Sequence, residues 1–202
     1  MIVSNCIGCE SFPCVDVIHD RYIIPEIEID PALIKMLMIS EAAPKDADDY
    51  FYAGRDSLFE QTTLLAFKDA GVEAGSIQEL VDMGVYFTTA VKCGKIGYGI
   101  KAATIKECSL ILGQEIALFP NVLVFMLMGD AAIKSLNYIA KREGEPRVIP
   151  AGSTYNIRGE SYTYRGKRAF PSYLQAGPSF FIEKSKRRMI AEDIKAALSL
   201  IA

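Results

Sequence analysis

The sequence predicts an α/β protein, a three-layer α/β/α sandwich around a short, mainly parallel central sheet of about four strands. Two observations support this prediction. Short apolar runs alternate along the chain with segments of helical periodicity. The central runs are also apolar on both faces, as parallel strands covered by helices are. The chain has 202 residues, half of them apolar, and no internal repeat or linker, so we expect a single domain over residues 1–202.

Three segments are the predicted central strands. Residues 35–40 form a short apolar run that leads into an acidic loop containing proline. Residues 85–91 are β-branched and aromatic, and residues 122–128 are apolar throughout. In a doubly wound sheet, ligands bind at the carboxyl ends of the strands, so we expect the loops after these three segments to carry the functional residues.

Five segments carry helical periodicity or helix start and stop signals. They are residues 57–70, 76–83 and 102–119, a segment opened by Gly129 and Asp130, and residues 183–201. Between the last two, glycines punctuate polar, tyrosine-rich sequence. That composition predicts a β-ribbon excursion near residues 150–168.

The charge balance limits the classes of partner. The formal net charge of −3 argues against a protein that coats nucleic acid non-specifically, so any DNA contact would use a local basic surface. Arg165, Lys167 and Arg168 are the candidates for the DNA backbone, and residues 184–188 form a second basic group that is as well explained as a solvated helix face. The longest apolar run is far shorter than the roughly 20 residues that cross a bilayer, and the N-terminus lacks secretory features. We therefore expect a cytoplasmic protein without a membrane partner.

The cysteines form two pairs that could converge. Cys6 and Cys9 stand in a Cys-x-x-Cys pattern, whereas Cys93 ends a predicted strand and Cys108 lies in the following helix. Four thiolates suit an iron–sulfur cluster or tetrahedral zinc. Spacing alone leaves open the alternative that these are ordinary buried thiols.

In order along the chain, these motifs resemble family-four uracil-DNA glycosylases, the thermostable iron–sulfur type. Cys6-x-x-Cys9, with Cys93 and Cys108 separated by fourteen residues, is similar to the family's ligand set. Residues 40–44, Ser-Glu-Ala-Ala-Pro, resemble its Gly-Glu-Ala-Pro-Gly motif, and residues 170–174, Phe-Pro-Ser-Tyr-Leu, its His-Pro-Ser loop. The resemblance runs from Cys6 to about residue 193.

The resemblance implies a structural 4Fe–4S cluster held by Cys6, Cys9, Cys93 and Cys108. Cys14 is then left over, unless its loop is rearranged so that it replaces one ligand. Zinc, or no metal at all, remains the alternative.

Hydrolysis of the bond between a base and deoxyribose passes through an oxocarbenium-like sugar. A carboxylate must either stabilise this cation or orient the water molecule that attacks it. Glu41, at the end of the first predicted strand, has the type and place for this role, and Asp46, Asp48 and Asp49 in the same loop could assist, with Asp48 as the first choice. A solvated acidic loop is the alternative. By the resemblance, Tyr52 or its neighbour Phe51 stacks on an extruded base, although both could equally be core residues.

Two departures from the family put uracil excision itself in question. Thr89 stands where the family reads the base with an asparagine, and a hydroxyl lacks the two-sided pattern of an amide. Phe170 stands where a histidine assists the leaving base, next to Ser172 in the same loop, and the only histidine, His19, lies outside every motif.

Three functions remain open. One is hydrolysis of a base N-glycosidic bond in DNA, with uracil or another damaged base as substrate. Another is a catalytically silent relative that binds nucleic acid or a nucleotide-like ligand. The third is a metal-stabilised interaction domain.

Overall fold

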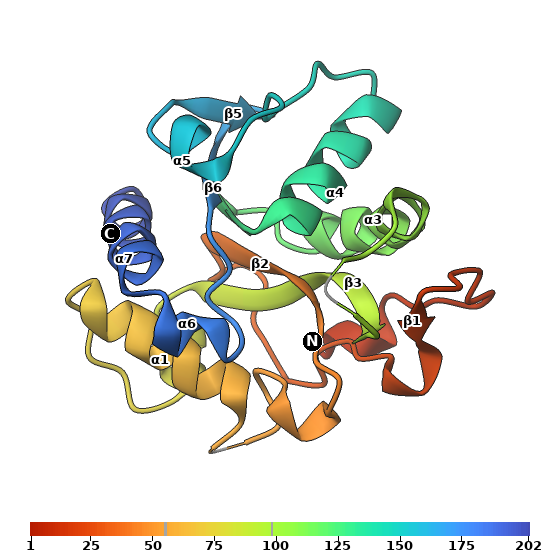
Figure 1. Ribbon diagram of the computed structural model, residues 1–202, viewed down its shortest axis with the longest axis horizontal. Helices are drawn as coiled ribbons and strands as arrows, with labels where there is room; N and C mark the ends of the chain where they lie inside the picture. Colours follow the sequence, from red (N-terminus) through yellow and green to blue (C-terminus); the bar gives the residue numbers. More distant parts are fainter. Residues whose placement is uncertain (55, 98) are drawn as a thin grey trace.

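The computed structural model describes residues 1–54, 56–97 and 99–202, which fold around one six-stranded sheet of order β1-β3-β2-β4-β6-β5 (Figure 1). The strands are β1 (Val17–Ile18), β2 (Met36–Ala43), β3 (Val85–Lys95), β4 (Val124–Met128), β5 (Tyr162–Tyr164) and β6 (Lys167–Ser172). The α-helices are α1 (Leu58–Asp69), α2 (Ile77–Asp82), α3 (Ala102–Ala117), α4 (Asp130–Arg142), α5 (Thr154–Ile157), α6 (Ser179–Ile182) and α7 (Lys184–Leu198).

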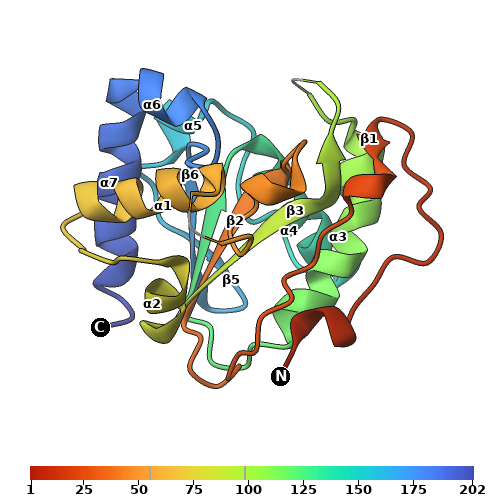
Figure 2. The same ribbon diagram turned by 90° about the horizontal axis from the view of Figure 1, so that it is seen from below.

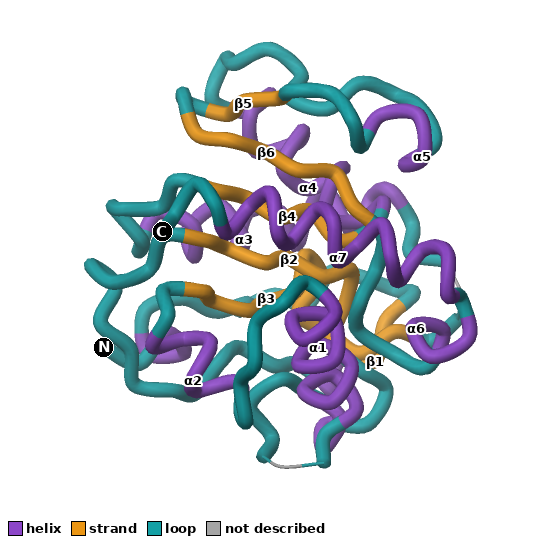
Figure 3. Tube along the Cα trace, turned by 90° about the vertical axis from the view of Figure 1, so that its left-hand side faces the viewer, coloured by secondary structure: helices purple, strands orange, loops and turns teal. Residues whose placement is uncertain are grey.

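The inner strands β3, β2, β4 and β6 are parallel, whereas the edge strands β1 and β5 are antiparallel to their neighbours. Figure 3 shows the strands β5, β6, β4, β2 and β3 stacked in this order from top to bottom. The α/β class is confirmed. The expectation of about four strands is wrong, because two edge strands extend the sheet and make it partly antiparallel.

Helices cover both faces of the sheet (Figure 2). The chain moves from β2 to β3 through α1 and α2, and then returns past β2 to β4 through α3. Because right-handed crossovers in opposite directions lie on opposite faces, α1 and α2 cover one face, joined by α7, and α3 and α4 cover the other. The loops after β2 and β4 therefore diverge and leave a crevice at the carboxyl ends of these strands.

Serine caps set the beginning of α1 and α2. The hydroxyl of Ser57 accepts a hydrogen bond from the amide of Glu60 (3.3 Å), and that of Ser76 accepts one from the amide of Glu79 (3.2 Å). This Ser-x-x-Glu pattern satisfies amides that a helix start leaves without partners. The helices expected at residues 57–70 and 76–83 are thus confirmed with the boundaries that capping chemistry gives.

The expected β-ribbon near residues 150–168 is only partly right. Residues 154–157 form the short helix α5, and the hairpin proper joins β5 to β6. Arg165 and Gly166 connect these strands with positive φ angles of 50° and 73°, the backbone that a tight two-residue hairpin requires. Residues 170–172, expected to form a loop, lie within β6.

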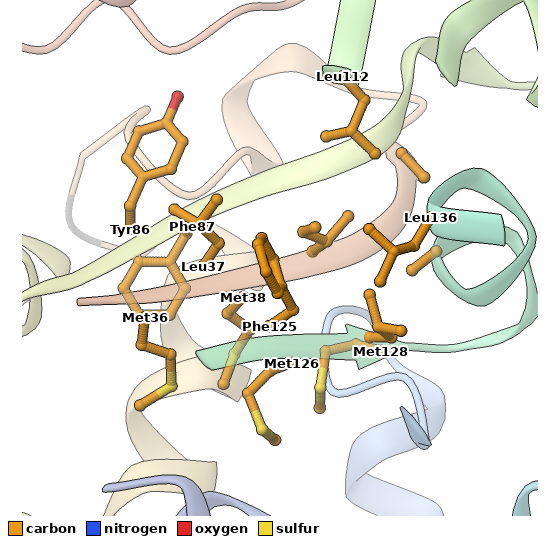
Figure 4. Packing of buried hydrophobic residues seen from close by; sticks show 14 of the residues in the cluster. Met36, Leu37, Met38, Tyr86, Phe87, Leu112, Phe125, Met126, Met128 and Leu136 are labelled. Carbon is orange, nitrogen blue, oxygen red and sulfur yellow. The ribbon is translucent and has the colours of Figure 1, made fainter. Parts of the chain in front are cut away.

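The core is built on β2, where residues 36–39 are buried on both faces of the sheet. Their side chains pack with Phe87 of β3 and Phe125 of β4, while Leu112 of α3 and Leu136 of α4 reach toward the sheet (Figure 4). Burial on both faces explains why these strands read as continuous apolar runs. None of the helices among the described residues has the length and apolar character needed to cross a membrane.

Two leucines of α3 test this packing. Leu112 is fully buried, whereas Leu110 is 48% exposed. We expect Leu112→Ala to lower the free energy of unfolding by about 3 kcal/mol, because it removes buried methyl groups and leaves a cavity. Leu110→Ala should cost less than about 1 kcal/mol. Urea unfolding of both variants measures the difference, and equal losses would contradict the orientation of α3.

Candidate functional site

Glu41 lies in the crevice at the carboxyl end of β2. It lines a cavity of about 500 Å³ with Lys95 of β3, Asp49 of the acidic loop and Leu174 after β6. The side chain of Lys95 lies 3.3 Å from the carboxylate of Glu41. The structure therefore places the predicted carboxylate at the position where doubly wound proteins bind ligands.

Glu41 also packs against the start of α4. Gly129, which precedes the helix, has a φ angle of +101°, and a Cβ atom there would lie 2.8 Å from Cγ of Glu41. The amide of Gly129 donates to the carbonyl oxygen of Ser172 (3.0 Å), so the loops after β2, β4 and β6 meet around this carboxylate. The positive end of the helix dipole favours a negative charge at that point.

Of the three aspartates predicted to assist, Asp49 lines the cavity, whereas Asp46 and Asp48 are not among the described residues that line it. Asp46 caps a 3₁₀ turn (Ala47–Asp49) by accepting from the amide of Asp48 (3.2 Å). Asp49 accepts from the amide of Leu58 at the start of α1 (3.3 Å). Part of this acidic cluster is therefore capping chemistry, and Asp49 combines capping with a place beside Glu41.

The predicted stacking aromatics are packed elsewhere. Phe51 is almost fully buried against Phe59 and Phe87. The hydroxyl of Tyr52 donates to the carbonyl oxygen of Phe87 (3.0 Å) and accepts from its amide (2.9 Å), so Tyr52 caps the outer edge of β3. With Tyr50, Tyr52 lines a different cavity, next to the N-terminal segment. Stacking of Tyr52 on a base stays a prediction. It would require the two hydrogen bonds between Tyr52 and Phe87 to break.

The predicted base-contacting residues Thr89, Phe170 and Ser172 are buried in strands and do not line the Glu41 cavity in the described part of the chain. Phe170 packs under the guanidinium group of Arg168, 4.4 Å from its ring centre. Ser172 donates to the carboxylate of Asp193 (2.6 Å). Their roles toward a base remain predictions that this arrangement does not favour.

Sequence reasoning missed Gln175. This fully buried amide accepts a hydrogen bond from the hydroxyl of Ser40 (3.1 Å), the residue before Glu41. Its signal in the sequence was an amide between Leu174 and Ala176, directly after the loop-like motif. Gln175 ties the segment after β6 to the end of β2 and so supports the wall of the cavity.

The basic residues predicted for DNA lie far from Glu41. Arg165 precedes β6 and Lys167 and Arg168 begin it, so the length of the strand, about 16 Å from Lys167 to Ser172, lies between this group and the carboxyl end. Arg165 is paired with Glu143 (2.8 Å). The contact of these three basic residues with the DNA backbone stays a prediction, and it would lie at some distance from Glu41.

Two lysines lie closer to Glu41 than this basic group. Lys45 and Lys95 both line the cavity of Glu41. The second basic group begins α7, where Arg187 pairs with Asp69 of α1 (2.5 Å) and so joins two helices. That contact agrees with a structural role for Arg187.

A buried ion pair fastens β3 to α3. Lys92 and Glu115 are almost completely buried and hydrogen-bonded to each other. Glu115 also accepts from Tyr86 (2.7 Å) and Thr88 (2.9 Å), and Thr88 accepts from Lys92 (2.7 Å). Burial, together with the charge of Glu115, raises the pKa of Tyr86 well above its usual range. This network fixes the last part of β3, which contains Cys93 and Lys95.

The five cysteines are free thiols. Cys93 and Cys108 are buried, Cys9 and Cys14 are partly buried, and Cys6 is exposed. Burial raises the pKa of Cys93 to about 12 and that of Cys108 to about 11, and neighbouring cysteines contribute to both shifts. Among the described residues, no three His, Cys, Asp or Glu side chains lie close enough together to hold a metal ion as placed. The predicted metal site therefore stays a prediction.

Comparisons with known proteins add no family. No protein-family model matches the chain, and no curated protein is significantly similar to it. The resemblance to uracil-DNA glycosylases rests on the motifs and their order along the chain.

The buried ion pair gives a second prediction. Glu115→Gln should lower the free energy of unfolding by about 3 kcal/mol, because it leaves the ammonium group of Lys92 buried without a counter-charge. Glu107→Gln, on an exposed position of the same helix, should change it by less than about 0.5 kcal/mol. Urea unfolding of both variants measures the difference. If Glu115→Gln left the free energy of unfolding unchanged, the ion pair would not anchor β3.

Proposed function

We propose that this protein hydrolyses the N-glycosidic bond of a base in DNA, uracil or another damaged base, with Glu41 as the catalytic carboxylate. The observation that carries the proposal is the position of Glu41. It stands at the crevice between β2 and β4, in a cavity of about 500 Å³, a volume in the range of small-ligand sites. The motif resemblance supports the same reaction from the sequence.

Glu41 would act on the sugar side of the reaction. As the bond between base and C1′ breaks, positive charge develops on the sugar, and a carboxylate at this place stabilises it or orients a water molecule for attack on C1′. The start of α4 and the side chain of Lys95 both place positive charge beside the carboxylate of Glu41. The attacking water forms the new C1′–O bond and gives its proton to Glu41, while the departing base takes the electrons of the C1′–N bond and is protonated from solvent.

Lys95 and Lys45 would hold the flanking phosphates or the developing charge on the base. They are the cationic side chains among the described residues that line this cavity. The family's histidine has no equivalent there, since Phe170 is buried in β6. Loss of one such donor lowers a rate by a factor of about 10² to 10³, so we expect slow turnover.

A silent nucleotide-binding relative is the second candidate, and one contact favours it. The hydroxyl of Tyr52 is fixed to both backbone groups of Phe87, which keeps the predicted stacking ring away from the Glu41 cavity. A protein with this arrangement could bind a nucleotide through its lysines without excising the base.

Glu41→Gln tests the proposed reaction. Single-turnover cleavage would be measured with labelled oligonucleotides that carry uracil or other deaminated bases, in single- and double-stranded form. We expect Glu41→Gln to reduce cleavage at least 100-fold, because the amide cannot stabilise the cationic sugar. Glu73→Gln, on an exposed position between α1 and α2, should cleave like the wild type.

DNA binding separates the two candidates. A fluorescent oligonucleotide titrated at increasing salt should bind more weakly as salt rises, because lysine contacts to phosphates release counterions. Binding without cleavage of any substrate would contradict the enzyme and support the silent relative. The absence of both at low salt would contradict the enzyme and any relative that binds DNA.

A further inference from the structure

Two sets of contacts tie the N-terminal loop to β3 and α3. The first involves Asp16, whose carboxylate accepts from the amide of Lys101 (2.7 Å) and from the hydroxyl of Thr104, and so caps the start of α3. Cys14 stands two residues before Asp16, and Cys108 lies one helical turn beyond Thr104 on the same side of α3. This cap therefore brings Cys14 beside Cys108.

The second set of contacts involves Tyr22. Its hydroxyl accepts a hydrogen bond from the amide of Cys9 (2.8 Å). The next residue, Ile23, donates its amide to the carbonyl oxygen of Lys92 (2.8 Å), directly before Cys93. Cys9 is therefore held near Cys93, as Cys14 is held near Cys108.

Cys6 lies outside these contacts. It ends a short 3₁₀ turn (Val3–Asn5), its thiol is directed at the carbonyl oxygen of Ile2 (3.6 Å), and its side chain is exposed. Burial is the main cause that raises the pKa values of Cys93 and Cys108, and the nearby thiols of Cys14 and Cys9 add to it. Burial raises the pKa of Cys14, and contacts with Thr104 and Cys108 moderate the shift.

We propose that Cys9, Cys14, Cys93 and Cys108 form a four-thiolate site for a soft metal centre, either an iron–sulfur cluster or a zinc ion, and that Cys6 is not a ligand. This set differs from the one that the motif resemblance implies, in which Cys6 is a ligand and Cys14 is left over. It combines the buried thiols of Cys93 on β3 and Cys108 on α3 with two thiols of the N-terminal loop. The hydrogen bonds of Asp16 and Tyr22 hold this loop beside β3 and α3.

The site would close by movement of the loop. Sulfur atoms around a tetrahedral zinc ion lie about 3.8 Å apart, and the described thiols are not gathered to that extent. Residues 7–15 form neither helix nor strand, and Cys9 and Cys14 in this loop border a cavity of about 600 Å³ beside Cys108. Cys6 also borders this cavity, but it lies before the loop and its thiol is directed at Ile2. Inward movement of this loop brings Cys9 and Cys14 toward sulfurs that β3 and α3 already hold.

Matched serine variants test the ligand set. Wild type, Cys14→Ser and Cys6→Ser would be purified anaerobically, reconstituted in parallel with iron and sulfide or with zinc, and analysed for bound metal. We expect wild type and Cys6→Ser to bind equal amounts and Cys14→Ser to bind at least fivefold less. Broad visible absorption identifies a cluster, whereas zinc without colour identifies the ion.

Alkylation gives a second readout that does not depend on how the variants fold. Iodoacetamide added to metal-loaded wild type should modify Cys6 and leave Cys14 unmodified, as peptide mass spectrometry would show. Modification of Cys14, loss of metal from Cys6→Ser alone, or failure of wild type to bind either metal would overturn the proposal. None of these measurements uses base excision, so the site can be judged independently of the proposed activity.

Discussion

The pairing of β2 with parallel strands on both sides is the constraint on which the rest of the structure depends. Residues 36–39 bond to β3 on one side and to β4 on the other, and both of their faces are buried. Because the chain leaves β2 and β4 toward opposite faces, a crevice must form where they end. Glu41 is the first charged residue beyond this buried segment, and Gly129 supplies the backbone without a Cβ that lets the carboxylate reach the start of α4.

The contact between β3 and α3 has a comparable role for the cysteines. The pair of Lys92 and Glu115 is buried deeply enough that either charge alone would be costly, so the register between strand and helix is well specified. Cys93 follows Lys92 directly, and Cys108 lies two turns before Glu115 on α3. The two buried thiols are therefore positioned by packing and ion pairing, whereas the loop cysteines depend on hydrogen bonds to Asp16 and Tyr22.

Prediction from the sequence succeeded where a local signal was strong. Helical periodicity together with helix start and stop signals marked the longer helices, and apolar runs marked β2, β3 and β4. It failed where tertiary pairing decides: β1 has two residues, too few for any periodicity, and β6 contains Pro171 and begins with charged residues. We placed Arg165, Lys167 and Arg168 near the predicted site because they are close to Phe170 in sequence. In the structure β6 is extended, so residues at its amino end lie far from the site at its carboxyl end. Gln175 was missed because its importance comes from a partner 135 residues away.

The composition of the Glu41 cavity limits how a base could be recognised. Its charged groups among the described residues are Glu41, Lys45, Asp49 and Lys95, and no asparagine or glutamine side chain lines it. Amides discriminate between bases because they offer a donor and an acceptor together, whereas lysines recognise phosphate and negative charge regardless of the base. An amide rejects a wrong base because its donor and acceptor are then left without partners. A site that has no amide therefore discriminates less between bases. Excision at this cavity would consequently be governed more by how easily a nucleotide leaves the stack than by the pattern of its edge, which favours mismatched or damaged positions as a class over uracil alone.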